Sequence, residues 1–118
     1  MRFDLDDRET AWRDEVRRFV REAADPAWMN RWATNYERSG TPEGVAWRKA
    51  LGARNWLCLG WPPEYGGLGR SFMDQWILHD EVSRTGLPKL GIGVNMIAHT
   101  LMRVADDAMK AEWLPRIA

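Results

Sequence analysis

The sequence predicts an all-α fold of about five to six helices, and three observations support that prediction. Apolar residues recur every three or four positions along most of the chain, which is the period of a helix. Capping residues, followed by proline or by an acid three positions on, recur between these stretches. No alternating run of apolar and polar residues is long enough for a strand. A chain of 118 residues is expected to form one domain over residues 1–118.

The first predicted helix lies within residues 1–24. Asp6 and Glu9 have the spacing of a capping box at its start. On its polar face, acids precede arginines by four positions, as in Glu9 and Arg13, and this order favours a solvated helix surface over an anion site. The apolar residues at helical spacing are Leu5, Trp12, Val16, Phe19, Val20 and Ala23.

Two more helices are predicted at about residues 25–38 and 42–55. Each opens on a capping residue followed by proline at the first helical position, Asp25-Pro26 in one case and Thr41-Pro42 in the other. The first of these two carries an aromatic stripe, typical of a packed core, made of Trp28, Trp32 and Tyr36.

The stretch from Trp56 to Arg70 follows, and we expect the rest of the chain to be organised around it. Residues 56–60 are a short apolar run and predict an extended, buried segment. Its cysteine, Cys58, is expected to be a small buried hydrophobic residue. Residues 61–70 predict a specified loop, because prolines fix φ and glycines supply positive φ. The glycines expected to do so are Gly66, Gly67 and Gly69.

Three helices are predicted after this loop. One runs from Ser71, with Asp74 three positions on as a capping signal, to Thr85. The next, in residues 91–105, is apolar nearly all round, so it is expected to be buried or to border a cavity. The last begins at Asp106 and is expected to end at Pro115.

Charge and composition exclude several function classes. Seventeen basic and seventeen acidic residues are interleaved, which argues against a nucleic-acid footprint and an electrostatic membrane anchor. No apolar run approaches the roughly 18 residues that span a bilayer, and no signal peptide precedes the first helix. We therefore expect a cytoplasmic protein without a membrane span or nucleic-acid partner.

No catalytic or metal-binding residue can be named from the sequence. The two histidines, His79 and His99, lack ligand partners at helical spacing, so no metal site is expected. The glycines of the loop lack the strand and later acid of a dinucleotide fingerprint. No serine or cysteine has a base placed to activate it. His99 stands out only because it lies in a mostly apolar segment.

Four blocks of the chain, in order and spacing, resemble the N-terminal helical domain of the acyl-CoA dehydrogenase family. They are the run Leu59-Gly60-Trp61-Pro62-Pro63-Glu64-Tyr65-Gly66-Gly67-Leu68-Gly69, then Asp80-Glu81-Val82-Ser83-Arg84, then Gly93-Val94-Asn95-Met96-Ile97, and finally Lys110-Ala111-Glu112-Trp113-Leu114-Pro115-Arg116-Ile117. The resemblance implies an orthogonal helical bundle. It also implies that the β-barrel-like middle domain and the C-terminal helical domain are absent from this chain.

In that family FAD lies between the two missing domains, and the C-terminal part supplies the catalytic glutamate. The resemblance therefore implies that this chain contributes part of the acyl-binding pocket, with no catalytic residue, and is inactive alone. The implied pocket helix corresponds to residues 91–102. At regular helical spacing one face of it carries Ile92, Asn95, Met96 and His99, two apolar and two polar side chains. His99 stands, with Ala98, where many members have glycine and proline.

We therefore expect the N-terminal domain of an FAD-dependent acyl-CoA dehydrogenase. Its expected partners are an acyl-CoA substrate, an electron-transfer flavoprotein or similar acceptor, and other subunits of a homo- or hetero-oligomer. The tryptophan-rich region from Trp28 to Trp47 resembles that of bacterial family members that act on bulky substrates. The resemblance therefore implies a polycyclic or branched acyl group, as in fatty acid or steroid side-chain β-oxidation. Two alternatives remain open at this point. One is a related acyl-CoA oxidase or flavin monooxygenase, and the other is a non-catalytic helical module that binds a partner through exposed tryptophans.

Overall fold

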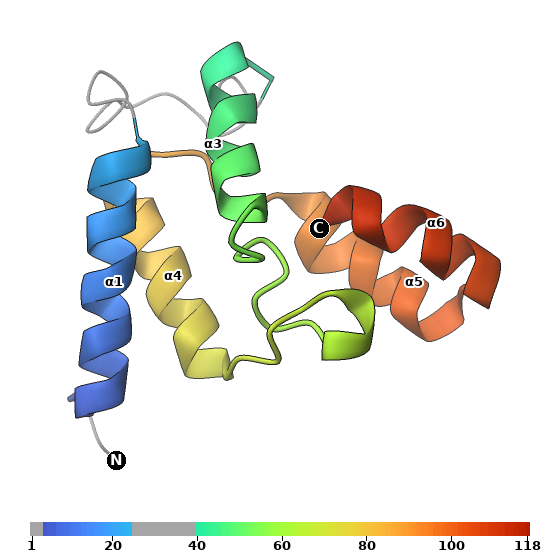
Figure 1. Cartoon of the computed structure of the whole chain (residues 1–118), viewed down its shortest axis with the longest axis horizontal. Coiled ribbons are helices and arrows are strands. Elements are labelled where there is room, and N and C mark those ends of the chain that lie inside the picture. Colours follow the sequence, from blue (N-terminus) through green and yellow to red (C-terminus); the bar gives the residue numbers. More distant parts are fainter. Residues whose placement is uncertain (1–3, 25–39) are drawn as a thin grey trace. The chain divides into compact units, whose positions relative to one another are not determined.

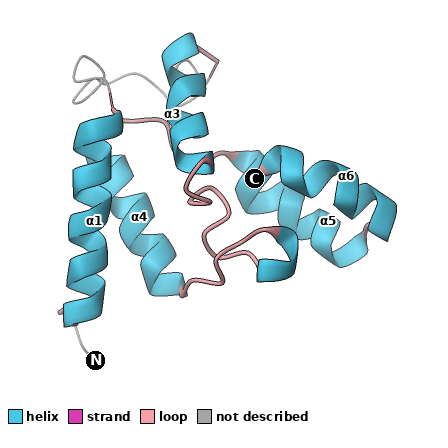
Figure 2. Ribbon diagram, in the orientation of Figure 1, coloured by secondary structure: helices cyan, strands magenta, loops and turns pink. Residues whose placement is uncertain are grey.

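The computed structural model describes residues 4–24 and 40–118 (Figure 1). These residues form helices joined by loops, and none of them forms a strand (Figure 2). The expected all-α fold class is confirmed. The predicted helix at 25–38 and its aromatic stripe lie outside the described residues. The chain divides into two compact units. Unit 1 is Met1–Trp47 with Ser71–Lys89, and unit 2 is Arg48–Arg70 with Leu90–Ala118.

Unit 1 contains helix α1, Asp7–Ala23, which begins as the sequence predicts. The Asp6 carboxylate accepts a hydrogen bond from the Glu9 backbone N–H at 2.7 Å, and the Glu9 carboxylate accepts one from the Asp6 N–H at 2.8 Å. This capping box satisfies two backbone donors that a helix start otherwise leaves unpaired. The buried side chains of α1 are Trp12, Val16, Phe19 and Val20, all four from the predicted apolar face.

Helix α4, Phe72–Thr85, also lies in unit 1 and has the predicted ends. The Ser71 side chain accepts a hydrogen bond from the Asp74 N–H at 3.1 Å. At the other end Gly86 has a φ of 75°, the left-handed conformation that a glycine directly after a helix predicts. Helices α1 and α4 lie side by side and run in the same direction (Figure 1).

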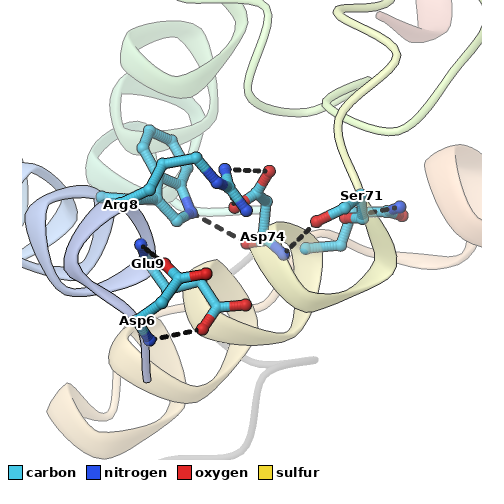
Figure 3. A network of polar contacts seen from close by, with 7 residues as sticks. Asp6, Arg8, Glu9, Ser71 and Asp74 are labelled. Atoms are coloured by element: carbon cyan, nitrogen blue, oxygen red, sulfur yellow. Dashed lines mark hydrogen bonds and ion pairs between the residues drawn. The ribbon is translucent and has the colours of Figure 1, made fainter.

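Two ion pairs join α1 to α4, and neither was predicted from the sequence. Arg8 lies 2.9 Å from the Asp74 carboxylate, and Arg17 lies 2.9 Å from that of Glu81. The side chains of these acids are only 2% and 9% exposed. The Trp12 indole N–H also donates to the backbone carbonyl of Asp74 at 3.0 Å, so the first turn of α4 is bound to α1 by main chain and side chain (Figure 3).

Helix α3, Pro42–Gly52, begins in unit 1, and Trp47 anchors its first half there. The Trp47 indole N–H donates to the Pro88 carbonyl at 3.0 Å, and its ring centre lies 5.6 Å from that of Phe19. The Thr41 hydroxyl accepts from the Gly44 N–H, as expected of a helix cap. Trp47 thus buries its ring and satisfies its polar atom at the same time.

The apolar run in unit 2 is buried, as predicted, but it is not extended. Residues 57–60 form a tight turn, closed by a hydrogen bond from the Trp61 N–H to the Cys58 carbonyl at 2.9 Å. The prediction of an extended segment was wrong because burial alone does not separate a turn from a strand in a run this short. The core that the run forms contains Trp56, Leu57, Cys58, Leu59 and Trp61.

The second half of unit 2 departs from regular α-helix. Residues Gly93–Ile97 (η3) form a π-helical turn, which is closed by a hydrogen bond from the Ala98 N–H to the Gly93 carbonyl. The turn continues into α5, Ala98–Val104. Helix α6, Asp107–Ile117, begins at the predicted cap Asp106. It does not end at Pro115, because a proline in the last turn removes only one backbone donor and the helix continues to Ile117. No helix of the described ranges is long and apolar enough to cross a membrane.

Replacing Arg17 by alanine should destabilise the protein by about 1–3 kcal/mol, because it leaves the nearly buried Glu81 carboxylate without its cation. Arg84→Ala is the matched control, since Arg84 pairs with Asp80 through a side chain that is 65% exposed. Urea unfolding measures both. Equal shifts in the two midpoints would contradict the assignment of the Arg17 pair as a stabilising tie.

Stability should also fall as the pH is lowered below about 6.5, in part through His79. Burial, with the charge of Lys89 nearby, lowers the pKa of His79 below its ordinary value of 6.5. Between the folded and unfolded pKa values the unfolded chain binds more protons, so stability rises with pH there and is fully present above 6.5. His79→Gln should flatten this part of the pH profile in urea unfolding. An unchanged slope in the variant would show that His79 does not cause it.

Candidate functional site

The glycine loop of unit 2 is a rigid turn with its own internal hydrogen bonds. A short 3₁₀ turn, Pro63–Tyr65 (η2), opens it, and Gly66 and Gly69 have φ values of 86° and 58°. Those two glycines confirm the predicted positive φ, and the 3₁₀ turn is regular structure that the sequence did not predict. The N–H groups of Gly66, Gly67 and Gly69 all donate to carbonyls within the loop, those of Pro63, Pro62 and Trp61.

Gly67 is needed for another reason, which is close approach and not positive φ. A Cβ atom built on Gly67 would lie 2.1 Å from the Trp61 carbonyl oxygen and 2.5 Å from the Trp61 Cβ. No side chain fits in that space. The Gly69 N–H donates to the same Trp61 carbonyl at 3.0 Å. The loop therefore closes directly on the backbone of Trp61 and holds it in place.

Trp61 in turn contacts a residue of the predicted site. Its side chain is buried, with 2% of the residue exposed. The ring centre of Trp61 lies 6.4 Å from that of His99, and the two planes meet edge to face at 70°. His99 itself is exposed on α5. A fixed tryptophan thus supports one side of an imidazole whose other side faces solvent.

All four predicted site residues are exposed in the structure. Ile92 and Met96 are 68% and 64% exposed, and Asn95 and His99 are also in the exposed class. The segment turns Val94 and Ala98 inward instead, with 6% and 0% exposed. It is therefore not buried all round, so the expectation of a fully buried helix was wrong, and a border with a cavity stays a prediction.

The π turn changes how these four residues line up. In a regular α-helix a residue and the seventh after it lie on nearly the same line. The wider turn at Gly93–Ile97 rotates the residues after it by up to about 100° relative to that arrangement. Ile92 and His99 are therefore offset around the helix, and the exposed apolar surface is broader than the sequence spacing suggested. It also includes Ile97, which is 51% exposed.

This surface carries no groups for acid–base or nucleophilic chemistry beyond the imidazole of His99. It presents aliphatic carbon, a flexible thioether, one amide and one imidazole. Such a set suits the burial of an apolar ligand with one or two polar positions. No group of three or more metal-ligating side chains was found within the described ranges 4–24 and 40–118.

Cys58 is not a nucleophile in this structure. Its thiol is fully buried and lies 3.4 Å from the Gly66 carbonyl and 3.6 Å from that of Asn55. Burial raises the pKa of the Cys58 thiol, so the unreactive protonated form dominates at neutral pH. The prediction of a buried structural cysteine is confirmed.

Unit 2 also contains a hollow of about 620 Å³, lined in part by Tyr65 and Gly66 of the loop. Its lining is mixed, with Tyr65, Lys110 and Leu114 among its residues, and none of the four predicted site residues takes part. The hollow is open, and its lining also includes the acidic residues Glu64 and Asp107. The exposed surface of residues 92–99 remains the candidate site.

Comparison with known proteins gives a consistent result. The sequence profile described as "Acyl-CoA dehydrogenase, N-terminal domain" matches residues 6–118. The acyl-CoA dehydrogenase FadE26 of Mycobacterium tuberculosis is 48% identical over 68 residues, which cover 58% of this chain and 17% of that protein.

Two solved structures are also similar. The steroid acyl-CoA dehydrogenase complex Tcur3481-Tcur3483 matches with a TM-score of 0.85 and 33% identity, covering 99% of this chain and 30% of the matched one. The ChsE4-ChsE5 complex of Mycobacterium tuberculosis matches with a TM-score of 0.77 and 33% identity, covering 99% and 29%. The chain thus spans less than a third of the length of each of these proteins.

Replacing Gly67 by alanine should destabilise unit 2 by about 2–3 kcal/mol, because the new methyl group would overlap the Trp61 carbonyl. Gly40→Ala is the matched control, since nothing lies within 4 Å of a Cβ there and its φ is not positive. Thermal unfolding followed by tryptophan fluorescence measures both changes. A melting temperature lowered equally by the two variants would contradict the close-approach argument.

Proposed function

This chain belongs to the acyl-CoA dehydrogenase family as its N-terminal domain, and we propose that it forms one wall of the acyl-binding pocket in a longer flavoprotein. That flavoprotein would desaturate an acyl-CoA thioester between its α and β carbons. The observation that supports this role is the exposed apolar surface at residues 92–97, on the segment that the family resemblance assigns to the pocket. A surface of this kind is costly to leave in water and is typical of a site that a ligand or another domain covers.

This wall would bind and orient the acyl tail, and it would supply no reacting group. Ile92 and Met96 would bury the apolar tail, and the thioether of Met96 adapts to irregular shapes. Asn95 and His99 would meet polar positions on the tail. Packing against the tail would exclude water from it and would also fix where the thioester end lies, which is the contribution of such a wall to the reaction.

The glycine loop of this chain does not fit the phosphate-binding loop of a flavin site. The glycine loop follows a 3₁₀ turn, not a strand, and its glycine N–H groups already donate to carbonyls of the loop itself. They are therefore not free to cradle a phosphate. The proposal is that FAD, which would accept the hydride, is bound by parts of the longer protein, and we assign no flavin-binding group to this chain.

The substrate we propose is a bulky, alicyclic acyl thioester. The broad surface created by the π turn suits a wide tail better than a single helical stripe would. One similar solved structure is described as a steroid acyl-CoA dehydrogenase. The two solved structures named above are two-component complexes, so we also propose that the longer protein assembles with other subunits. We further propose that it passes electrons to an electron-transfer flavoprotein or a similar acceptor.

Ile92→Trp or Met96→Trp, made in the longer flavoprotein, should lower kcat/KM for wide alicyclic acyl thioesters at least tenfold, with a smaller loss for short linear ones. The indole would fill space that we assign to the tail. The preference between the wide and the short thioesters is measured from the bleaching of flavin absorbance during reaction with each of them. Val104→Trp is the control, because Val104 is 78% exposed on the same continuous helix, eight residues beyond Met96. An unchanged size preference in both pocket variants would remove the proposed pocket role.

A further inference from the structure

We infer that Trp61 is a positioning residue for His99, and that the pair selects acyl tails that carry a hydrogen-bonding oxygen. The inference deepens the proposed function and rests on it, since it concerns the same surface. It adds a role in substrate selection for the glycine loop, which fixes Trp61.

His99 is a polar group on a surface that is otherwise mostly apolar. Its exposed neighbours in the preceding turn are the apolar Met96 and Ile97 and the polar Asn95. Neutral imidazole offers one donor and one acceptor, so it can bond to either a hydroxyl or a ketone oxygen. When the pocket closes over a tail without such an oxygen, the imidazole loses water and gains no partner. That loss is what makes a hydrogen-bonding site reject the deoxygenated analogue.

An exposed histidine selects well only if its ring is held in one orientation. Trp61 supplies that restraint through the edge-to-face contact at 6.4 Å between ring centres. Trp61 is itself fixed, because it is 2% exposed and its carbonyl accepts from the Gly69 N–H while Gly67 packs directly against it. The loop glycines therefore hold Trp61 in place, and Trp61 in turn restrains the ring of His99.

This arrangement spares part of the ordering cost of binding. A side chain that is free in the unbound protein loses rotamer freedom when it bonds a ligand, and that loss weakens binding. A ring already restrained by a buried neighbour loses less. The loop would then matter for selectivity as well as for folding, and its effect should appear as a change in preference between two substrates.

The positioning claim can be tested on the 118-residue chain by NMR. The chain has only two histidines, so His79, in unit 1, serves as the internal reference. We expect nuclear Overhauser contacts between the Trp61 indole and the His99 imidazole protons, and a shift of the His99 ring protons in Trp61→Phe while those of His79 stay in place. Wild-type spectra with no Trp61–His99 contact would overturn the positioning claim without need of a variant.

The selectivity claim is tested in the longer flavoprotein with two acyl thioesters that differ only by a hydroxyl or a hydrogen on the tail. His99→Phe should reduce the ratio of their kcat/KM values about tenfold by lowering the value for the hydroxylated one. Trp61→Phe should reduce the ratio by a smaller factor, and the double variant should lose no more than His99→Phe alone. His79→Gln is the control and should leave the ratio unchanged.

The outcomes separate this inference from the proposed function. Turnover of both thioesters with an unchanged ratio in His99→Phe would overturn the inference and leave the pocket proposal standing. Absence of turnover with any acyl thioester would overturn the proposed function and the selectivity claim together, while the spectra still decide the positioning claim.

Discussion

The close approach of Gly67 to the Trp61 backbone is the constraint on which the order of unit 2 depends. A loop with two prolines and three glycines would be an expensive element to order if it had no anchor. Here the anchor is a carbonyl that no residue with a side chain could approach, together with a hydrogen bond from Gly69. Once Trp61 is fixed, its ring has a defined position beside His99, and its N–H closes the buried turn by donating to the Cys58 carbonyl.

Unit 1 is held by a different device, which is the pairing of two nearly buried acids with arginines of α1. Burying a carboxylate is costly unless it is paired and hydrogen-bonded, so these contacts fix the register of α4 against α1 as well as contributing energy. Asp74 and Glu81 are seven residues apart on α4, which places them on one face two turns apart. Arg8 and Arg17 meet them in the same order along α1. The parallel arrangement of the two helices follows from this order.

Features encoded by neighbouring residues could be predicted from the sequence. The caps at Asp6, Ser71 and Asp106 and the glycine end at Gly86 depend on backbone groups within a few positions, and each was confirmed. Features that need a distant partner could not be predicted. Asp74 is an ordinary capping-box acid by its spacing, and only the fold brings Arg8 to it from 66 residues away. The ion pairs of Asp74 and Glu81 with α1 therefore could not be predicted.

The candidate site was predictable in part for the same reason. The exposure of Ile92, Asn95, Met96 and His99 is consistent with the pocket that the resemblance implied, but their role in binding stays a prediction. The spacing of apolar residues does not predict the π turn. Gly91 and Gly93 at its start do lower the free-energy cost of an irregular backbone. The Trp61–His99 contact joins residues 38 positions apart and was equally hidden from sequence reasoning.

The most direct measurement of the central claim is photolabelling of the longer flavoprotein with an acyl-CoA analogue that carries a diazirine at the far end of a bulky tail. Peptide mapping by mass spectrometry would then locate the label. The account predicts labelling within residues 92–99, suppressed by an unlabelled substrate. Labelling that leaves this segment untouched and falls elsewhere, with the same competition by substrate, would contradict it.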